Sequence, residues 1–486
     1  MTATMEDLRT KYEVVIGLEV HAQLKTKSKI FSRASAVFGN DHNANVNPVC
    51  LGLPGVLPVL NKEVVDMGIL TGLALNCNIA KFSKFDRKQY FYPDLPKGYQ
   101  ISQFDMPIAE SGFLMVNGKK IRINRVHMEE DAGKLVHSGA NGLAGSTSSN
   151  VDLNRAGVPL LEIVSEPDLR SAEDARAYME EIRNIVRYIG VCDGNLEEGS
   201  LRCDANVSIR PFGQEEYGTK AEIKNMNSFR AMQRAVETEI DRQIELVEAG
   251  ERVVQESRLW NEALGITESM RSKEEAHDYR YFPEPDLMPL EITPEWIGGI
   301  QSSMPELPAQ KRARYQTECG LSEYDAVNIV ETMELARYFD RVIELGTNVK
   351  AAANWLMGDI TAYTKETKLS ITETKLTPET LVELITLIDK GTISNHIAKQ
   401  IIVELLEKGG PVQKLIEEKG LSVIGNQDEL KDIVLQVLAE NQSQVEKYKS
   451  GKPQLFGFFV GQVMKLTKGR ANPQMVNDIV QQELDK

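Results

Sequence analysis

The sequence predicts an α+β fold: an N-terminal domain built on an antiparallel sheet with covering helices, followed by an all-α helical region and a tail. Up to about residue 295 the chain is rich in Gly, Pro and Asn and contains strands of alternating polarity. After about Pro305 it shows almost only the spacing by threes and fours that is typical of helices. We therefore expect domains at 1–295, 296–409 and 410–486, with Gly409-Gly410-Pro411 at the second boundary.

The clearest strand begins at Val14. Its even positions through Leu24 are all apolar, which places Glu19, His21 and Gln23 together on the opposite face. Such strict alternation indicates a strand with one buried face and one polar face.

Further strands show charged polar faces. Residues 201–210 alternate cleanly, and 160–166 place Glu162 and Glu166 on one side. One-faced strands of this kind suit an antiparallel sheet that is half buried. The polar positions of the strand at 201–210 and of segment 218–225 include Arg202, Asp204, Asn206, Lys220, Glu222 and Lys224.

Two helices are expected to cover the buried face of this sheet. They run from Ser171 to Gly190 and from about Ser228 to Gly250, each with a serine N-cap and a glycine at its C-terminal end. Their apolar stripes are interpreted as core, without a functional role.

Composition excludes several classes of protein. The 486 residues carry a net charge of −15, which argues against a general DNA-coating protein but leaves room for a local basic patch that binds one RNA. No run of 18 apolar residues and no secretory signal is present, so we expect no membrane association. Five cysteines without a C-x-x-C pair favour reduced thiols in the cytoplasm.

Two motifs combine metal-ligating residue types. Glu19-Val-His21 places a carboxylate and an imidazole two residues apart on one strand face, which suits Mg²⁺ or Mn²⁺ with several waters, or a transition metal; the alternative is an exposed strand face with a chance histidine. His127-Met-Glu-Glu-Asp-Ala-Gly-Lys134 places Glu129, Glu130 and Asp131 in succession. Acids this crowded require a compensating cation, or else they form a solvated turn.

A third motif interleaves aromatic and basic residues. Segment 84–103 combines lysines and an arginine with tyrosines and phenylalanine on a proline-bounded loop, and 277–286 repeats this chemistry. Aromatic rings stack bases while cations hold phosphates, so the loops resemble a surface for a single-stranded RNA end; an ordinary proline-ordered loop is the alternative. No P-loop or Rossmann motif is present. The residues thus indicate either a metal-dependent phosphoryl-transfer enzyme acting on an RNA-linked substrate or an RNA-binding platform.

Longer strings resemble one family. Ile16-Gly-Leu-Glu-Val-His21, the acidic motif at 127–134, Glu197-Glu-Gly-Ser-Leu-Arg-Cys-Asp-Ala-Asn206 and Asp278-Tyr-Arg-Tyr-Phe-Pro-Glu-Pro-Asp286 are similar to the B subunits of aspartyl/glutamyl-tRNA(Asn/Gln) amidotransferases. Asn354-Trp-Leu-Met357 and Lys468-Gly-Arg-Ala-Asn-Pro-Gln474 extend the resemblance to the C-terminus.

The resemblance implies a reaction and its partners. The family uses ATP and Mg²⁺ to phosphorylate the side-chain carboxyl of Glu-tRNA(Gln) or Asp-tRNA(Asn), and ammonia channelled from the amidase (A) subunit then displaces the phosphate. A small (C) subunit completes a heterotrimer. The alternative within the same complex is a non-catalytic tRNA-binding platform. Which misacylated tRNA is used depends on the synthetases of the organism, and the sequence leaves this open.

The resemblance also implies site residues. Glu19, His21, Glu130 and Lys88 are expected to be catalytic, and Glu19, His21, Glu129 and Glu130 to bind Mg²⁺ (or Mn²⁺), with Asp131 nearby. Many members carry a four-cysteine zinc knuckle, but the equivalent positions here are Ser32, Ala34, Asn47 and Cys50, so no zinc is expected. The residues expected around ATP and the tRNA 3′ end are Arg87, Lys88, Arg202, Asp204, Lys220, Glu222, Lys224 and Arg280.

The tail resembles the YqeY proteins, which implies contact with the body of the tRNA. From Lys447 to Asn477 there is no Asp or Glu, although the whole chain is acidic. Phosphate contacts from such a segment position an RNA without reading its bases. The basic residues are Lys447, Lys449, Lys452, Lys465, Lys468 and Arg470.

Overall fold

The computed structural model describes residues 4–138, 148–272, 279–421, 427–467, 470–471 and 473–485. Most of the Gly- and Ser-rich stretch 138–149, which the composition assigns to a loop, lies outside these residues, as do Asp278 and Lys468. The chain divides into two compact units, Met1–Leu307 and Pro308–Lys486. The division lies twelve residues beyond the boundary expected at 295.

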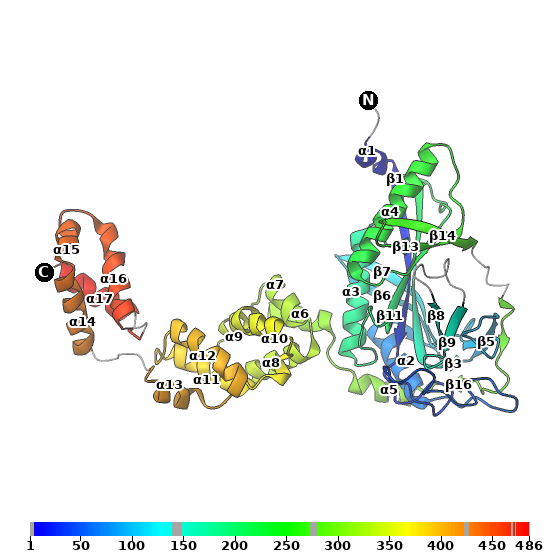
Figure 1. Ribbon diagram of the computed structural model, residues 1–486, viewed down its shortest axis with the longest axis horizontal. Coiled ribbons are helices and arrows are strands. Elements are labelled where there is room, and N and C mark those ends of the chain that lie inside the picture. Colours follow the sequence, from blue (N-terminus) through cyan, green and yellow to red (C-terminus); the bar gives the residue numbers. More distant parts are fainter. Residues whose placement is uncertain are drawn as a thin grey trace. The chain divides into compact units, whose positions relative to one another are not determined.

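The N-terminal unit is built on one nine-stranded sheet (Figure 1). All neighbours in it are antiparallel except β12 and β13, which run parallel, so the expected α+β class with an antiparallel sheet is confirmed. In spatial order the strands are β14 (Ile266–Ser272), β13 (Glu256–Asn261), β12 (Ala221–Lys224), β11 (Leu201–Pro211), β1 (Tyr12–Gln23), β10 (Pro159–Ser165), β7 (Lys119–Glu130), β6 (Ala109–Val116) and β2 (Asn78–Ile79).

The buried face of the sheet follows the alternation of the sequence. Ile16, Leu18 and Val20 of β1 are fully buried, and helices α3 (Ala172–Tyr188) and α4 (Phe229–Glu248) pack beside the sheet on this apolar side (Figure 1). The Ser171 and Ser228 side chains accept hydrogen bonds from backbone N–H groups in the first turns of α3 and α4, as an N-cap requires. The two expected helices are thus confirmed, and they leave the other face of the sheet for polar residues.

Shorter elements surround the polar face. A three-stranded sheet joins β15 (Phe282–Pro283), β4 (Asp86–Gln89) and β5 (Tyr99–Ser102), and Gln100 of β5 donates a hydrogen bond to the backbone carbonyl of Glu130 at the end of β7 (2.7 Å). This contact fixes the aromatic and basic segments beside the central sheet. The remaining elements of the unit are α1 (Met5–Arg9), α2 (Lys62–Ala74), α5 (Pro294–Ser303), and the pairs β3 (Phe82–Ser83) with β16 (Leu290–Glu291) and β8 (Lys134–Ser138) with β9 (Ser148–Asp152).

The C-terminal unit is helical, as the sequence predicts. The Glu383 carboxylate of α11 accepts hydrogen bonds from the backbone N–H groups of Val412 and Gln413, so α13 is attached to α11, on the C-terminal side of the expected boundary at 409. Helices α6 to α13 are α6 (Pro308–Thr317), α7 (Glu323–Ile329), α8 (Met333–Glu344), α9 (Val349–Trp355), α10 (Thr361–Thr367), α11 (Pro378–Asp389), α12 (Asn395–Lys408) and α13 (Val412–Lys419).

The last helices have a core of their own. Leu430, Val434, Phe459 and Val463 are fully buried in it, although Phe459 and Val463 come from the basic segment. None of the helices in the described ranges combines the length and apolar character that a membrane crossing requires. These last helices are α14 (Gln427–Glu440), α15 (Gln442–Lys449), α16 (Phe456–Leu466) and α17 (Pro473–Leu484).

Candidate functional site

Strand register brings the polar side chains of β1, β10 and β7 together. His21 of β1 is paired with Glu162 of β10, and Glu162 is in turn paired with His127 of β7. Directly opposed residues project to the same face of a sheet, so these three side chains form a row across three strands. Glu129 lies two residues beyond His127 and therefore shares its face.

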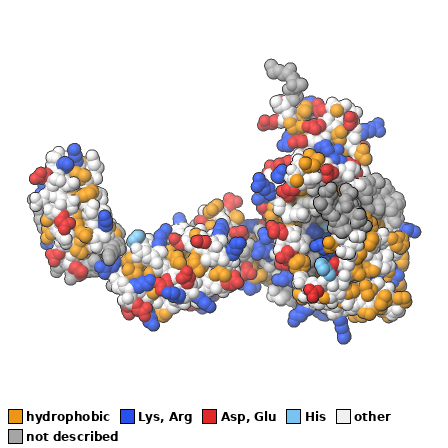
Figure 2. All heavy atoms as spheres, viewed as in Figure 1, with side chains coloured by type: hydrophobic (Ala, Val, Ile, Leu, Met, Phe, Trp, Pro, Cys, Tyr) orange, Lys and Arg blue, Asp and Glu red, His pale blue; other side chains and the backbone are white. Residues whose placement is uncertain are grey.

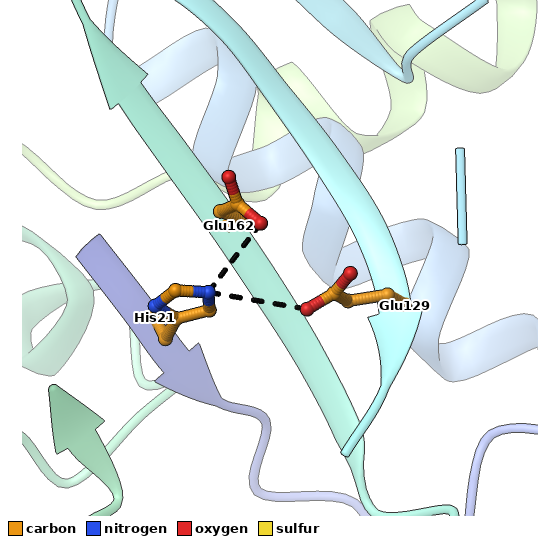
Figure 3. A group of neighbouring side chains, drawn as sticks. All are labelled: His21, Glu129 and Glu162. Carbon is orange, nitrogen blue, oxygen red and sulfur yellow. Dashed lines mark ion pairs between the residues drawn. The ribbon is translucent and has the colours of Figure 1, made fainter. Parts of the chain in front are cut away.

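His21, Glu129 and Glu162 form a compact cluster on this face (Figure 3), and His127 lies next to it in the row. His21 Nε2 lies 3.4 Å from Glu162 Oε2 and 4.0 Å from Glu129 Oε1. One ligand atom from each of these three residues lies within 4.8 Å of the others, a spacing that suits a single cation. Two carboxylates and one imidazole are a donor set for Mg²⁺ or Mn²⁺.

The electrostatics of the cluster indicate a need for positive charge. Burial acts first against ionisation of Glu162, but the imidazolium groups of His127 and His21 outweigh it and hold the pKa of Glu162 well below its usual range. Burial also opposes the charge on His127, yet Glu162 and Glu129 raise its pKa to about 9. The two acids thus call for nearby positive charge, which a divalent cation can supply when His21 binds it as a neutral imidazole. The residues present therefore fit such an ion.

A second polar group lies beside the cluster. Lys224 Nζ forms ion pairs with Asp204 (2.5 Å) and Glu222 (3.4 Å), and Asn206 donates a hydrogen bond to Glu19 Oε1 (2.9 Å). Burial disfavours the ammonium group, but the carboxylates of Asp204 and Glu222 outweigh it and raise the pKa of Lys224. Lys224 therefore remains charged on the floor of the site.

Residues of both groups, among them His21, Glu129 and Lys224, line one cavity of about 480 Å³. Lys88 of β4 enters it from the small sheet; burial opposes its charge, but Glu129 and Glu162 raise its pKa. The cavity thus combines an acidic floor with cations and aromatic rings that can hold an anionic, ring-bearing substrate. Its lining includes Glu19, His21, Lys88, Phe104, Arg125, His127, Glu129, Glu162, Asp204, Glu222, Lys224, Tyr279 and Tyr281.

Glu130 is not part of the cluster of His21, Glu129 and Glu162, and its expected role as a metal ligand stays a prediction. It follows Glu129 in β7, and successive side chains of a strand point to opposite faces. Its carboxylate forms an ion pair with Lys97 and accepts a hydrogen bond from the Ile101 backbone N–H (2.9 Å). Asp131 is likewise engaged elsewhere, by Arg202 at 2.6 Å. The three residues whose ligand atoms lie close enough to share one cation include Glu162 and do not include Glu130.

Other residues expected around ATP lie apart from the cavity lining. Arg87 forms two hydrogen bonds to the buried carboxylate of Glu284 (2.7 and 2.8 Å), which joins β4 to the segment after β15. Arg202 is paired with Asp131, while Lys220 and Arg280 are exposed. Of the expected nucleotide-binding residues, the cavity brings together Lys88, Asp204, Glu222 and Lys224.

Sequence reasoning missed Glu162 and His127 as members of the cluster. The alternation of residues 160–166 places Glu162 on a polar face, and His127 belongs to the acidic motif, so a signal for each is present. The missing element is the register between β1, β10 and β7, which joins segments that are far apart in the sequence.

The fold and the site together define a class: a cradle-like catalytic domain with an acidic, cation-compatible cavity, followed by a helical extension. The model of the GatB/GatE catalytic domain matches residues 14–298, and that of the GatB domain matches residues 337–484. The chain belongs to this family, the B subunits of tRNA-dependent amidotransferases, which form part of glutamine-hydrolysing ligases.

Curated relatives match along the whole chain. The B subunit of the aspartyl/glutamyl-tRNA(Asn/Gln) amidotransferase from Trichodesmium erythraeum (strain IMS101) is 56% identical over 494 residues, covering 100% of each chain. The proteins of the same name from Acaryochloris marina (strain MBIC 11017) and Thermosynechococcus vestitus (strain NIES-2133 / IAM M-273 / BP-1) are each 56% identical. The match to the Acaryochloris marina protein covers 99% of each chain. The match to the Thermosynechococcus vestitus protein covers 98% of this chain and 97% of the relative.

Proposed function

We propose that this chain phosphorylates the side-chain carboxyl of Glu-tRNA(Gln), Asp-tRNA(Asn) or both, using ATP, and then amidates it. The observation that carries the proposal is the cluster of His21, Glu129 and Glu162 on the floor of a cavity that also contains Lys88 and Lys224. Phosphoryl transfer depends on positioning and charge neutralisation more than on covalent help from the protein. A cavity with acids for a cation and lysines for phosphate oxygens provides both.

Each group has a role in this reaction. His21, Glu129 and Glu162 would hold Mg²⁺ or Mn²⁺, which when bound neutralises charge on the transferred phosphoryl group. Lys88 and Lys224 provide ammonium groups for phosphate oxygens, because neighbouring carboxylates keep both charged. The carboxylate of the substrate attacks the terminal phosphorus of ATP, giving an acyl phosphate and ADP.

Ammonia completes the reaction. Its nitrogen forms a bond to the carbonyl carbon of the acyl phosphate, the bond from that carbon to the phosphate oxygen breaks, and phosphate leaves as the nitrogen loses a proton. We propose that the amidase (A) subunit supplies this ammonia and that a small (C) subunit holds the amidase and this chain together as a heterotrimer in the cytoplasm.

An exposed apolar surface supports the presence of a partner protein. Figure 2 shows apolar side chains gathered on the lower right of the N-terminal unit. In segment 24–61 alone, Phe38 and Val59 are more than 70% exposed. Apolar side chains clustered at a surface are typical of protein interaction sites. The exposed large apolar residues of the segment are Val37, Phe38, Leu53, Leu57 and Val59.

The test is ATP hydrolysis that depends on misacylated tRNA, measured with the assembled complex. The Glu129→Gln variant keeps the shape of the side chain but removes a carboxylate of the cluster, so we expect roughly a 100-fold loss of this hydrolysis or more. Glu166→Gln is the matched control, because Glu166 accepts a hydrogen bond from Asn124 (2.7 Å) away from the cavity lining. Unchanged hydrolysis in Glu129→Gln would support the non-catalytic tRNA-binding platform instead.

A further inference from the structure

A continuous run of aromatic rings leads from the cavity toward the surface. Ring centroids are 4.2 Å apart for Phe104 and Tyr281, 6.1 Å for Tyr281 and Tyr279, 6.2 Å for Tyr279 and Tyr90, and 6.5 Å for Tyr90 and Tyr92. We call these five residues the aromatic run. Two segments far apart in the sequence build it, residues 90–104 and 279–281, so tertiary structure alone creates it.

The inner end of the aromatic run belongs to the candidate site. Phe104, Tyr281 and Tyr279 line the same cavity as His21, Glu129 and Glu162. Phe104 and Tyr281 are nearly parallel, with an angle of 11° between their planes. A ligand bound in this cavity can therefore contact these rings.

Ring surface remains open at both ends of the run. Phe104 is 49% exposed although it is stacked on Tyr281, and Tyr92 at the other end is 50% exposed. Rings that served only to pack the two loops together would be covered at both ends. The exposed ends indicate that planar ligand groups can stack there.

The charges along the aromatic run suit an anionic chain. Lys88 Nζ lies 4.8 Å from the centroid of Tyr279, and Arg125 lines the cavity near the inner rings. Rings with adjacent cations, arranged in a row, are the usual features of a surface that binds single-stranded nucleic acid. ATP carries one base, whereas an unpaired RNA end carries several in succession, and a run of five rings matches the latter.

We propose that Phe104 and Tyr281 stack the terminal unpaired nucleobase of the aminoacylated RNA, and that the outer rings of the aromatic run follow the preceding nucleotides. This inference rests on the proposed function, because it places the esterified amino acid next to the acidic floor. Phe104 and Tyr281 are positioning residues: by holding the terminal base they determine how far the esterified amino acid extends into the cavity.

The test separates the two sources of a base, RNA and ATP. In the assembled complex, Phe104→Ala removes one ring, and we expect KM for misacylated tRNA to rise about tenfold, the loss of one base–aromatic stack, while KM for ATP is unchanged. Phe104→Trp should restore KM for tRNA because it restores a stacking surface. Phe91→Ala is the matched control: Phe91 lies in the loop between β4 and β5, beside Tyr90 and Tyr92 in the sequence, and is 79% exposed, but its ring lies against Gly98.

A binding measurement is independent of catalysis. A tRNA whose terminal adenosine is replaced by 2-aminopurine should lose fluorescence on binding to the wild-type complex, and less so on binding to Phe104→Ala or Tyr281→Ala. A raised KM for ATP alone, or equal quenching in all variants, would overturn the inference. If the wild-type complex quenches the probe but shows no tRNA-dependent ATP hydrolysis, the proposed function fails while the stacking surface stands.

Discussion

His21 and Glu162 face each other across the ladder between β1 and β10, with 3.4 Å between Nε2 and Oε2. Glu162 also lies 3.2 Å from His127 Nε2, so one carboxylate joins two imidazoles. The pair lies at the centre of the candidate cation site. Acids that lie near it, such as Glu129, can bind the same cation.

Replacing Glu162 should weaken divalent cation binding. Glu162→Gln removes one of two carboxylates from the donor set, and we expect the affinity for Mn²⁺, measured by electron paramagnetic resonance or calorimetry, to fall roughly tenfold or more. Glu166→Gln, just beyond the end of the same strand, should bind Mn²⁺ like the wild type. Equal affinity in Glu162→Gln would exclude the cluster as the cation site.

Replacing Glu130 should affect stability and leave cation binding unchanged. Glu130→Ala leaves Lys97 without its buried partner, and removing one member of a buried pair costs about 3–5 kcal/mol of unfolding free energy. Thermal or urea unfolding measures this loss, and an Mn²⁺ titration of the folded variant measures the affinity. A large loss of Mn²⁺ affinity at unchanged stability would restore Glu130 to the ligand set.

Lys224 should matter for ATP without being needed for folding. Lys224→Gln removes an ammonium group that lines the cavity beside Asp204, and we expect KM for ATP to rise about tenfold, the loss of one charge-assisted hydrogen bond. Lys220→Gln, on the exposed stretch before β12, is the control. Turnover with an unaltered KM for ATP in Lys224→Gln would remove this residue from the nucleotide site. Circular dichroism confirms that the variant is folded.

Acid should remove the stabilising effect of Asp174 at the start of α3. Burial opposes its ionisation, but Lys119 (2.7 Å) and Asn117 outweigh it and lower the pKa of Asp174 below its usual value. Because the pKa of Asp174 is lower in the folded than in the unfolded state, its ionised carboxylate stabilises the fold at every pH above the unfolded-state pKa. This stabilisation is lost as the pH falls through the folded-state pKa. Asp174→Asn should therefore lower the melting temperature at pH 7, and the difference in melting temperature between variant and wild type should disappear below about pH 4. A gap independent of pH would show that charge plays no part.

Removing the last helices should weaken tRNA binding specifically. Because α13 is attached to α11, the chain is best ended after Gly420, which removes α14 to α17 together with their own core. We expect KM for misacylated tRNA to rise and its salt dependence to flatten, since the basic residues between Lys447 and Arg470 are lost. Glutamine hydrolysis by the amidase should be largely spared. Equal tRNA affinity of both complexes at low salt would contradict a tRNA-binding tail.

The sequence by itself determined the buried and polar faces of β1 and the starts of the two helices that cover the sheet, whereas segment 84–103, interpreted as a loop, contains β4 and β5. The alternation from Val14 to Leu24 predicted the buried and polar faces of β1, and the capping serines at 171 and 228 predicted where α3 and α4 begin. These features are local, because they depend only on side-chain period and on hydrogen bonds within a few residues.

Only the tertiary structure decided which polar residues meet. Glu129 and Glu130 are adjacent acids in one motif, and the register of β7 against β10 turns the first toward His21 and the second toward Lys97. A shift of one residue in that register would exchange their roles, because successive side chains of a strand point to opposite faces. Register depends on pairing between distant segments, which no local pattern in one sequence contains. For the same reason the sequence did not predict that Glu162 lies beside His21 or that Phe104 stacks on Tyr281.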